Sequence, residues 1–334
     1  MLSVALKQAS QRVSRLDRTL IMFVVLLTSV FPVELFPNAP PPPKGIDGQY
    51  SGRQGQVLLV KVPLPEEATE VKGTFLDRTI PFFREIRAGE PSGYLGLVGI
   101  DMQDAPGTYE LVVTVKSGEQ QPKRLSYHVL VTKEKFAVEH LKLPKDKVDL
   151  DDKTLTRWKM EQEQVRQALA DHSALRLWHS GFIEPVNGKR TGIFGSVRIM
   201  NGQPRNPHNG EDIGAPLGTD VAATNDGVVR LTVDHVFSGR GVFVDHGLGF
   251  YSMYFHLSEI LVKDGDLVKA GQIIGKVGAT GRATGPHLHW GVKLNGARVN
   301  PYALLDLPFK NGSGSATIVS PGSSATPEPL PIKQ

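Results

Sequence analysis

The sequence predicts a mainly β protein with two β regions joined by a helix. Short runs of alternating apolar and polar residues, separated by turn residues, occupy residues 48–133 and recur over residues 180–307. Residues 151–169, between them, place apolar side chains at helical spacing instead. A chain of 334 residues is long enough for two domains that each bury a core.

The composition excludes several classes of protein. Hydrophobic residues make up 40% and charged residues 22%, which is typical of a globular protein. The net charge is +4, but no basic cluster is interleaved with aromatic residues, so we expect no nucleic-acid partner. The chain has no cysteine. A disulfide framework and a thiolate metal site are therefore excluded, and any metal site must use histidine and carboxylate ligands.

The N-terminus resembles an export signal. Basic residues between Lys7 and Arg18 precede an apolar run from Leu20 to Phe31. The run is shorter than the roughly twenty residues that a membrane span needs. Residues 1–39 are therefore interpreted as a signal peptide, with an uncleaved membrane anchor through residues 20–36 as the alternative. Both interpretations place the rest of the chain outside the cytoplasmic membrane.

The first β region follows a proline-rich linker at residues 40–47. Over residues 48–133 the sequence predicts a small β-sandwich, immunoglobulin-like, with no catalytic constellation. A spacer, a wall-contacting module or a lid would all suit it. The predicted strands cover residues 56–62, 71–75, 94–100, 109–115 and 125–131.

A linker and helix occupy residues 134–179. Asp151 or Asp152 can cap the helix, and Leu155 and Val165 belong to its apolar face. The charged residues from Arg157 to Arg166 are expected to form its solvated surface.

The second β region, residues 180–307, is predicted to be antiparallel with almost no helix. Its strands are expected at residues 220–223, 227–232, 241–245, 251–256, 272–277 and 287–294, with a loop that enters a strand at residue 212. The Pro/Ser-rich tail, residues 308–334, is expected to be disordered.

The second β region also contains the candidate metal ligands. His287 and His289 are two apart in a strand, so both imidazoles face one side of a sheet. His208 and Asp212 lie four apart in a loop that enters a strand, and both can turn toward one ion. We hypothesise that His208, Asp212 and His289 hold one Zn²⁺, which leaves a fourth position for water, as in catalytic zinc sites.

Histidines are also the candidates for proton transfer. Bound zinc lowers the pKa of its water toward about 7 and polarises a carbonyl oxygen. The glutamate of a helical H-E-x-x-H motif is absent from the sequence. His256, in the run Tyr254-Phe255-His256-Leu257, and His287 are therefore predicted to transfer protons and to stabilise the oxyanion.

These motifs resemble the lysostaphin and LytM-like family of zinc peptidases, which cut peptide bonds in bacterial peptidoglycan. The likeness covers residues 180–305, from Ile193-Phe194-Gly195 through His208-Asn209-Gly210-Glu211-Asp212 to Gly285-Pro286-His287-Leu288-His289. It implies a LytM-like antiparallel sheet with His208, Asp212 and His289 as zinc ligands and His256 and His287 as catalytic residues. Ala283 stands where this family often has serine.

Substrate contacts are predicted at three positions near the motifs. Arg282 and Arg198 can bind carboxylates of peptidoglycan stem peptides through two hydrogen bonds each, and Tyr254 lies beside His256 in its motif. The expected bond is a D-Ala to diamino-acid cross-link rather than a glycine bridge, because glycine-bridge enzymes form a narrower group. Glu211 is expected to point away from the metal. The sequence does not indicate an oligomeric state.

Two other classes of function compete with this prediction. A non-catalytic activator of cell-wall hydrolases could keep the same fold without using the metal. A lipoyl or biotinyl carrier is the second alternative, because residues 262–275 resemble half of such a domain. The lysine-containing tip of a carrier is missing, however, and a carrier has no use for convergent histidines.

Overall fold

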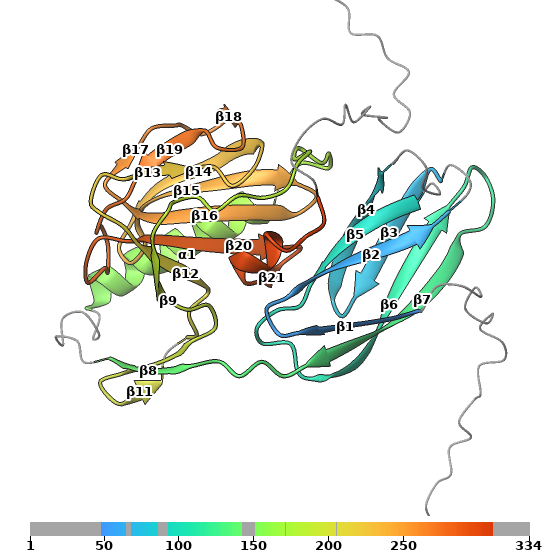
Figure 1. The fold of residues 1–334 in the computed structure, drawn as a ribbon, viewed down its shortest axis with the longest axis horizontal. Coiled ribbons are helices and arrows are strands. Elements are labelled where there is room, and N and C mark those ends of the chain that lie inside the picture. Colours follow the sequence, from blue (N-terminus) through green and yellow to red (C-terminus); the bar gives the residue numbers. More distant parts are fainter. Residues whose placement is uncertain are drawn as a thin grey trace, which may run out of the picture. The chain divides into compact units, whose positions relative to one another are not determined.

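The computed structural model describes residues 48–64, 68–85, 93–141, 151–170, 172–204 and 206–309, all within one compact unit. The predicted signal or anchor at residues 1–39 and the linker at 40–47 lie outside the described residues, as does the tail from residue 310. The mainly β class is confirmed: strands dominate both regions, and α1 is the one α-helix of the described residues (Figure 1).

The N-terminal β region has seven strands in the order β1-β7-β6-β3-β4-β5-β2 (Figure 1). The β1–β7 pair is parallel and the others are antiparallel. The structure contains the five predicted strands and adds β1 and β4. The bounds are β1 Gln49–Arg53, β2 Val57–Pro63, β3 Glu70–Phe75, β4 Arg78–Glu85, β5 Gly93–Gly99, β6 Gly107–Lys116 and β7 Lys123–Thr132.

Strand β4 changes its pairing partner at Pro81. Pro81 is the last residue of β4 that pairs with β3, and Phe82 is the first that pairs with β5. Proline has no N–H to donate to a ladder, which suits this point of transfer. The strands enclose a core that includes Phe75, Val98 and Leu111, all fully buried. The immunoglobulin-like topology stays a prediction.

The segment between the β regions contributes a strand and a helix. Strand β8, Val138–Leu141, pairs in parallel with β10 of the C-terminal region. Helix α1, Asp152–Ala170, matches the predicted helix. Asp151 caps it, because its Oδ1 accepts a hydrogen bond from the N–H of Thr154 at 2.6 Å.

The C-terminal region is built on an eight-stranded antiparallel sheet in the order β18-β14-β15-β16-β20-β12-β9, with β21 beside β20. Two three-stranded sheets, β11-β10-β8 and β13-β19-β17, and a 3-10 helix at Pro301–Leu304 accompany it. The bounds are β9 Lys189–Gly192, β10 Val197–Met200, β11 Gln203–Pro204, β12 Gly210–Gly214, β13 Asp220–Ala222, β14 Gly227–His235, β15 Gly239–Gly247, β16 Phe250–Leu257, β17 Glu259–Ile260, β18 Leu267–Val268, β19 Ile273–Lys276, β20 Leu288–Leu294 and β21 Ala297–Arg298.

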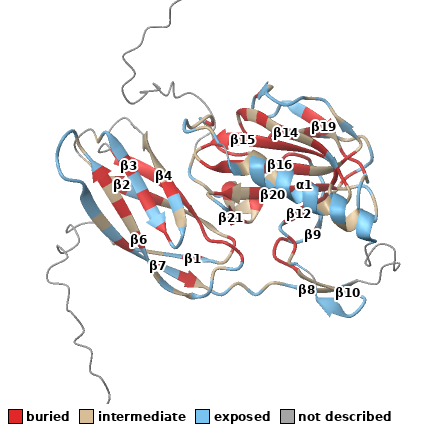
Figure 2. Cartoon of the chain, turned by 180° about the vertical axis from the view of Figure 1, so that it is seen from behind, coloured by how far each residue is buried: buried red, intermediate tan, exposed pale blue. Residues whose placement is uncertain are grey.

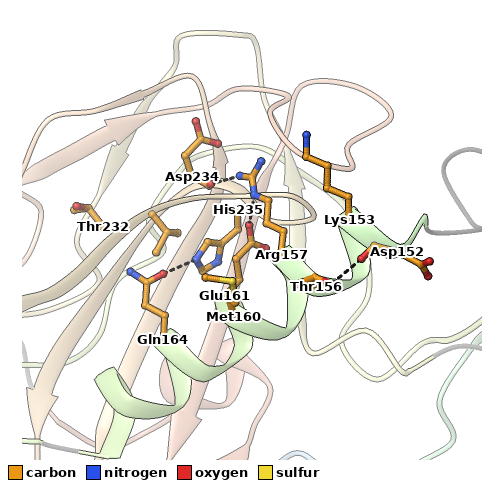
Figure 3. A pocket seen from close by; sticks show the side chains of 11 residues that line it. Asp152, Lys153, Thr156, Arg157, Met160, Glu161, Gln164, Thr232, Asp234 and His235 are labelled. Carbon is orange, nitrogen blue, oxygen red and sulfur yellow. Dashed lines mark hydrogen bonds and ion pairs between the residues drawn. The ribbon is translucent and has the colours of Figure 1, made fainter.

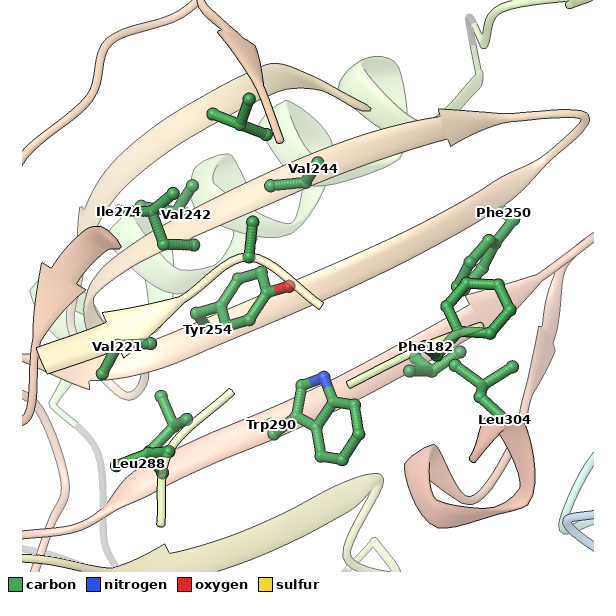
Figure 4. Close-up of a cluster of buried hydrophobic side chains, with 14 of the residues drawn as sticks. Phe182, Val221, Val242, Val244, Phe250, Tyr254, Ile274, Leu288, Trp290 and Leu304 are labelled. Carbon is green, nitrogen blue, oxygen red and sulfur yellow. The ribbon is translucent and has the colours of Figure 1, made fainter. Parts of the chain in front are cut away.

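Many residues of the strands of this sheet are buried (Figure 2), and apolar side chains pack on both of its faces. On one face, Val242, Tyr254 and Trp290 are fully buried in the main core (Figure 4). The other face carries a smaller cluster against which α1 packs. That cluster joins Leu231, Val233, Phe243, Met253 and Phe255 of the sheet to Val165, Ala168 and Leu169 of α1.

Polar contacts also attach α1 to the turn between β14 and β15. The carboxylate of Glu161, 8% exposed, accepts hydrogen bonds from the N–H of Val236 at 3.1 Å and from Arg157 at 2.8 Å. Arg157 also donates to the carbonyl of Asp234 (Figure 3). These two residues are therefore not part of a purely solvated surface, as the sequence had suggested, because the sheet supplies partners for both.

Candidate metal centre

Asp212 and His289 are brought together by strand pairing. They occupy neighbouring antiparallel strands, β12 and β20, and are register partners. Directly opposed residues of such a pair point to the same face and lie in contact. The carboxylate Oδ1 of Asp212 is 2.8 Å from Nδ1 of His289.

His208 precedes β12 and is held by its own backbone. Its N–H donates to Ser196 and its carbonyl accepts from Gly195. The Nδ1 atom lies 3.1 Å from the carbonyl of Ile193, so Nδ1–H is the donor and Nε2 keeps a lone pair. That Nε2 atom lies 2.9 Å from both Oδ1 of Asp212 and Nδ1 of His289.

The chemistry of this set fits a divalent metal ion. His208, Asp212 and His289 each offer one ligand atom, and the three atoms lie within 4.8 Å of one another. Burial raises the pKa of the Asp212 carboxyl group, but its close contacts with His208 and His289 outweigh burial and lower that pKa. Two imidazole nitrogens and one carboxylate oxygen suit zinc and leave a fourth position open.

Two glycines make room for the cluster. A Cβ on Gly210 would lie 2.5 Å from Nε2 of His289, and one on Gly192 would lie 2.3 Å from Oδ2 of Asp212. Any side chain there would displace a candidate ligand. Gly210 lies inside the motif and could be noticed in the sequence, whereas Gly192 reaches Asp212 through the pairing of β9 with β12.

His256 reaches the same face through a bulge in β16. Phe255 and His256 together lie opposite Gly241, because the β15–β16 register shifts there. Strict alternation would have placed His256 on the face of Tyr254. Instead its ring centroid is 4.7 Å from that of His287. The backbone of His256 is left-handed, with φ of 63°, a conformation that costs a non-glycine residue roughly 1 kcal/mol.

Backbone carbonyls orient both of these histidines. Nδ1 of His256 lies 2.8 Å from the carbonyl of Thr280, and Nδ1 of His287 lies 2.8 Å from that of Gly285. With Nδ1–H donating, Nε2 of each ring keeps a lone pair. Nε2 of His287 is 3.9 Å from Oδ1 of Asp212. Burial, reinforced by nearby His289, lowers the pKa of His256 to about 4, so this imidazole is neutral at neutral pH.

The three predicted substrate contacts lie in different surroundings. The exposed Arg282 has its guanidinium carbon 4.3 Å from the ring centroid of Phe237, in the turn whose Ser238 accepts a hydrogen bond from the N–H of His256. Arg198 lies on β10 and donates to Oδ2 of Asp212 at 3.1 Å. Tyr254 is not brought to the cluster, because it is fully buried on the other face of β16 (Figure 4).

Tyr254 belongs to a buried polar network instead. Its hydroxyl accepts from the N–H of Thr224 at 2.8 Å and bonds the hydroxyl of Ser252 at 2.8 Å. Ser252 in turn bonds Nε2 of His246 at 2.7 Å, and Nδ1 of His246 faces the carbonyl of Asp226 at 2.7 Å. His246 is fully buried, and burial favours the neutral form of its ring.

Acid should therefore weaken the fold through His246. Burial lowers the pKa of His246 to about 4, against 6.5 ordinarily. Between these values the unfolded chain binds a proton that the folded chain rejects, so stability falls as the pH falls through this window. Between pH 7 and pH 4.5, the free energy of unfolding should fall by about 2 to 3 kcal/mol more in the native chain than in His246→Gln. Urea titrations at both pH values measure this, and a constant difference would contradict it.

Glu211 points away from the metal ligands, as expected from the sequence. It is fully buried, and Arg190 contacts it through Nε at 3.1 Å and Nη2 at 2.5 Å. The Arg190 guanidinium carbon also lies 4.4 Å from the ring centroid of Tyr302. Burial raises the pKa of Glu211, and Arg190 opposes that rise.

Arg190→Met should destabilise the fold because it leaves a buried carboxylate without its partner. We expect a loss of about 2 kcal/mol, a value discounted because the Arg190 side chain is 44% exposed. Denaturant unfolding at pH 7 measures it. Arg166→Met is the control, since Arg166 and Glu163 form an exposed pair on α1 that solvent screens and should contribute little to stability. Equal losses in the two variants would contradict the assignment.

Three candidate ligands on one sheet face, with two further histidines beside them, form the arrangement of a metal-dependent hydrolase. The profile of peptidase family M23 matches residues 206–301, the range that holds all five residues. A solved structure of an M23 peptidase from Pseudomonas aeruginosa is 32% identical, with a TM-score of 0.56, and the alignment covers 74% of this chain and 92% of that one. The chain belongs to peptidase family M23.

Curated relatives match the peptidase region. Peptidoglycan DD-endopeptidase ShyA of Vibrio cholerae is 49% identical over 94 residues, which are 28% of this chain and 22% of ShyA. DD-carboxypeptidase/endopeptidase Mpg of Neisseria meningitidis is 42% identical over 97 residues, which are 29% of this chain and 22% of Mpg. The match thus spans about a fifth of the length of these relatives.

Several residues contribute to the site through their backbone, so their side chains could not reveal them in the sequence. Ile193, Thr280 and Gly285 act through backbone carbonyls that orient three histidines. Every residue type has such a carbonyl, so the residue type does not identify this role. Their positions close to the motifs would have been the one available hint.

Proposed function

We propose that this protein is a zinc-dependent endopeptidase that hydrolyses peptide cross-links of bacterial peptidoglycan. The observation that carries the proposal is the mutual spacing of 2.8–2.9 Å among Nε2 of His208, Oδ1 of Asp212 and Nδ1 of His289, with His256 and His287 beside them. Family membership and the names of ShyA and Mpg support the substrate class.

His208, Asp212 and His289 would hold one zinc ion per chain. When bound, the ion supplies a Lewis acid that polarises the scissile carbonyl and makes water acidic enough to attack near neutral pH. The ionised carboxylate of Asp212 contributes the negative charge of the ligand set. The carbonyl of Ile193 fixes the tautomer of His208, so that its Nε2 faces the ion.

His256 and His287 would move the protons. Each has Nε2 free as an acceptor because Nδ1–H is engaged by a carbonyl. One of the two accepts the proton of the attacking water and returns it to the leaving amine. Until it returns that proton, the protonated ring can also stabilise the oxygen that gains negative charge. We assign proton transfer and oxyanion stabilisation to His256 and His287 as a pair.

The proposed bond is the D-Ala to diamino-acid cross-link, in keeping with the DD-endopeptidase name of ShyA. Arg282 is the proposed contact for a stem-peptide carboxylate, because it is exposed in the loop that leads to His287.

Such a substrate lies outside the cytoplasmic membrane, and we place the protein there. Among the described residues no helix is long and apolar enough to cross a membrane. The candidate anchor, residues 20–36, lies outside those residues.

Digestion of defined muropeptides tests the proposal. The full chain, loaded with zinc, should convert a D-Ala to diamino-acid cross-linked dimer into monomers, as measured by mass spectrometry, and a chelator should stop the reaction. A dimer joined by a glycine bridge should remain intact. If a chain with one bound zinc cut neither dimer but stimulated other wall hydrolases, the activator hypothesis would replace this one.

A further inference from the structure

Arg198 contacts the carboxylate of a candidate metal ligand from outside the cluster. Its Nη2 lies 3.1 Å from Oδ2 of Asp212, while Oδ1 of the same carboxylate faces His208 and His289. The side chains of Arg198 and Asp212 are 25% and 13% exposed, so water screens the contact weakly. The two oxygens of Asp212 are therefore divided between a guanidinium and the metal position.

A strand from the segment between the two β regions supports Arg198 from the other side. In the parallel β8–β10 pair, Arg198 is the register partner of Glu139. Its Nε lies 3.5 Å from Oε2 of Glu139, and Nε itself is buried without a hydrogen bond, so this contact is an ion pair of opposite charges. The guanidinium is thereby held between two carboxylates, and the segment outside the peptidase profile reaches the candidate centre.

We propose that Arg198 is a positioning residue that commits Asp212 to bind the metal through Oδ1 alone. This inference rests on the proposed function. A carboxylate with both oxygens free can rotate and offer either one, or both, to a cation. A charge-assisted hydrogen bond to Oδ2 removes that freedom and satisfies an oxygen that burial would otherwise leave without a donor. Such outer partners of ligands contribute about 10- to 100-fold in metal affinity or activity.

The adjacent residue on β12 supplies a contrast. Glu211 also binds an arginine, Arg190, but its side chain points to the opposite face of the sheet. Arg190 and Arg198 thus each pair with a carboxylate of the same strand, and one of these carboxylates belongs to the metal-ligand cluster. A purely structural arginine should behave like Arg190. A positioning residue should change the properties of the bound metal.

The test measures metal binding by the full chain, with Arg198→Gln, Arg198→Lys and the control Arg190→Lys. Competition with a chromophoric chelator gives zinc affinity, and the absorption spectrum of the Co²⁺-substituted protein reports the ligand geometry. Arg198→Gln should bind zinc about 10- to 100-fold more weakly and change the Co²⁺ spectrum. Arg198→Lys should fall between it and the native chain, because a lysine keeps the charge but not the planar donor geometry. Arg190→Lys should match the native chain in both readouts.

Three results would count against this role. Native zinc affinity and a native Co²⁺ spectrum in Arg198→Gln would overturn it, whatever happens to cleavage. A raised KM with unchanged metal binding would mean that Arg198 contacts substrate, as the sequence alone suggested. Failure of the native chain to bind zinc would instead overturn the proposed function, and the role of Arg198 with it. Circular dichroism checks that each variant is folded. If Arg198→Gln does not fold, the zinc affinity and Co²⁺ spectrum of Arg198→Lys decide the question.

Discussion

His208→Ala should abolish metal binding and wall cleavage together. The native chain is expected to bind about one zinc ion, and removal of one of three protein ligands leaves too few to hold it. Cleavage of a cross-linked muropeptide should fall by at least about 1000-fold, because the metal supplies several kcal/mol of transition-state stabilisation. Metal analysis of protein purified without chelator and a cleavage assay give the two readouts.

His235→Ala is a matched control for this variant. His235 is 8% exposed and His208 is 3% exposed, but His235 contacts Gln164 on α1 rather than the cluster. The control should keep its zinc and its cleavage activity. Retention of zinc by His208→Ala at the native level would remove His208 from the ligand set and leave the proposed centre without support.

His287→Ala should separate metal binding from catalysis. His287 lies directly before β20, two residues from His289, but its Nε2 is 3.9 Å from Oδ1 of Asp212, farther than the ligand atoms lie from one another. We expect zinc content to stay at the native level while kcat falls by about 100- to 10,000-fold, the usual effect of losing a general acid–base group. Zinc analysis and kcat on a defined cross-linked dimer are measured on the same preparation.

Two outcomes would contradict the prediction for His287→Ala, and each has a different consequence. Loss of zinc from His287→Ala would make His287 a ligand and would require a new assignment for the cluster. Unchanged kcat would leave His256 as the histidine that transfers the proton. His256→Ala provides the comparison, because the His256 ring packs at a tilt against that of His287 and its Nδ1 is held by Thr280.

Local patterns were sufficient for most of the strands, and they led to the three candidate ligands that the structure brings together. Alternation predicted β20, and a period of two requires His287 and His289 to share a face. The lack of cysteine restricted the metal ligands to histidine and carboxylate. Strands β1 and β4 were missed for local reasons too. Gln49–Arg53 has little apolar alternation, and Pro81 interrupts the pattern of β4.

The Tyr254-Phe255-His256 run shows where local patterns fail. Alternation would place Tyr254 and His256 on one face, and Tyr254 was predicted to contact substrate beside His256. The structure separates them, because the bulge opposite Gly241 turns His256 toward His287 and leaves Tyr254 in the core. A bulge depends on the register with a neighbouring strand, and the residues of one strand alone do not determine that register.

By itself, then, the sequence determined the mainly β class, the residue types of the candidate metal ligands and their division between two distant motifs. The tertiary structure decided the rest. The pairing of β12 with β20 brought Asp212 opposite His289, and the bulge in β16 turned His256 to the same face. The pairing of β8 with β10 placed Glu139 beside Arg198, whose guanidinium also contacts Asp212. These outcomes are contacts between segments far apart in the chain, so no local pattern of residues could encode them.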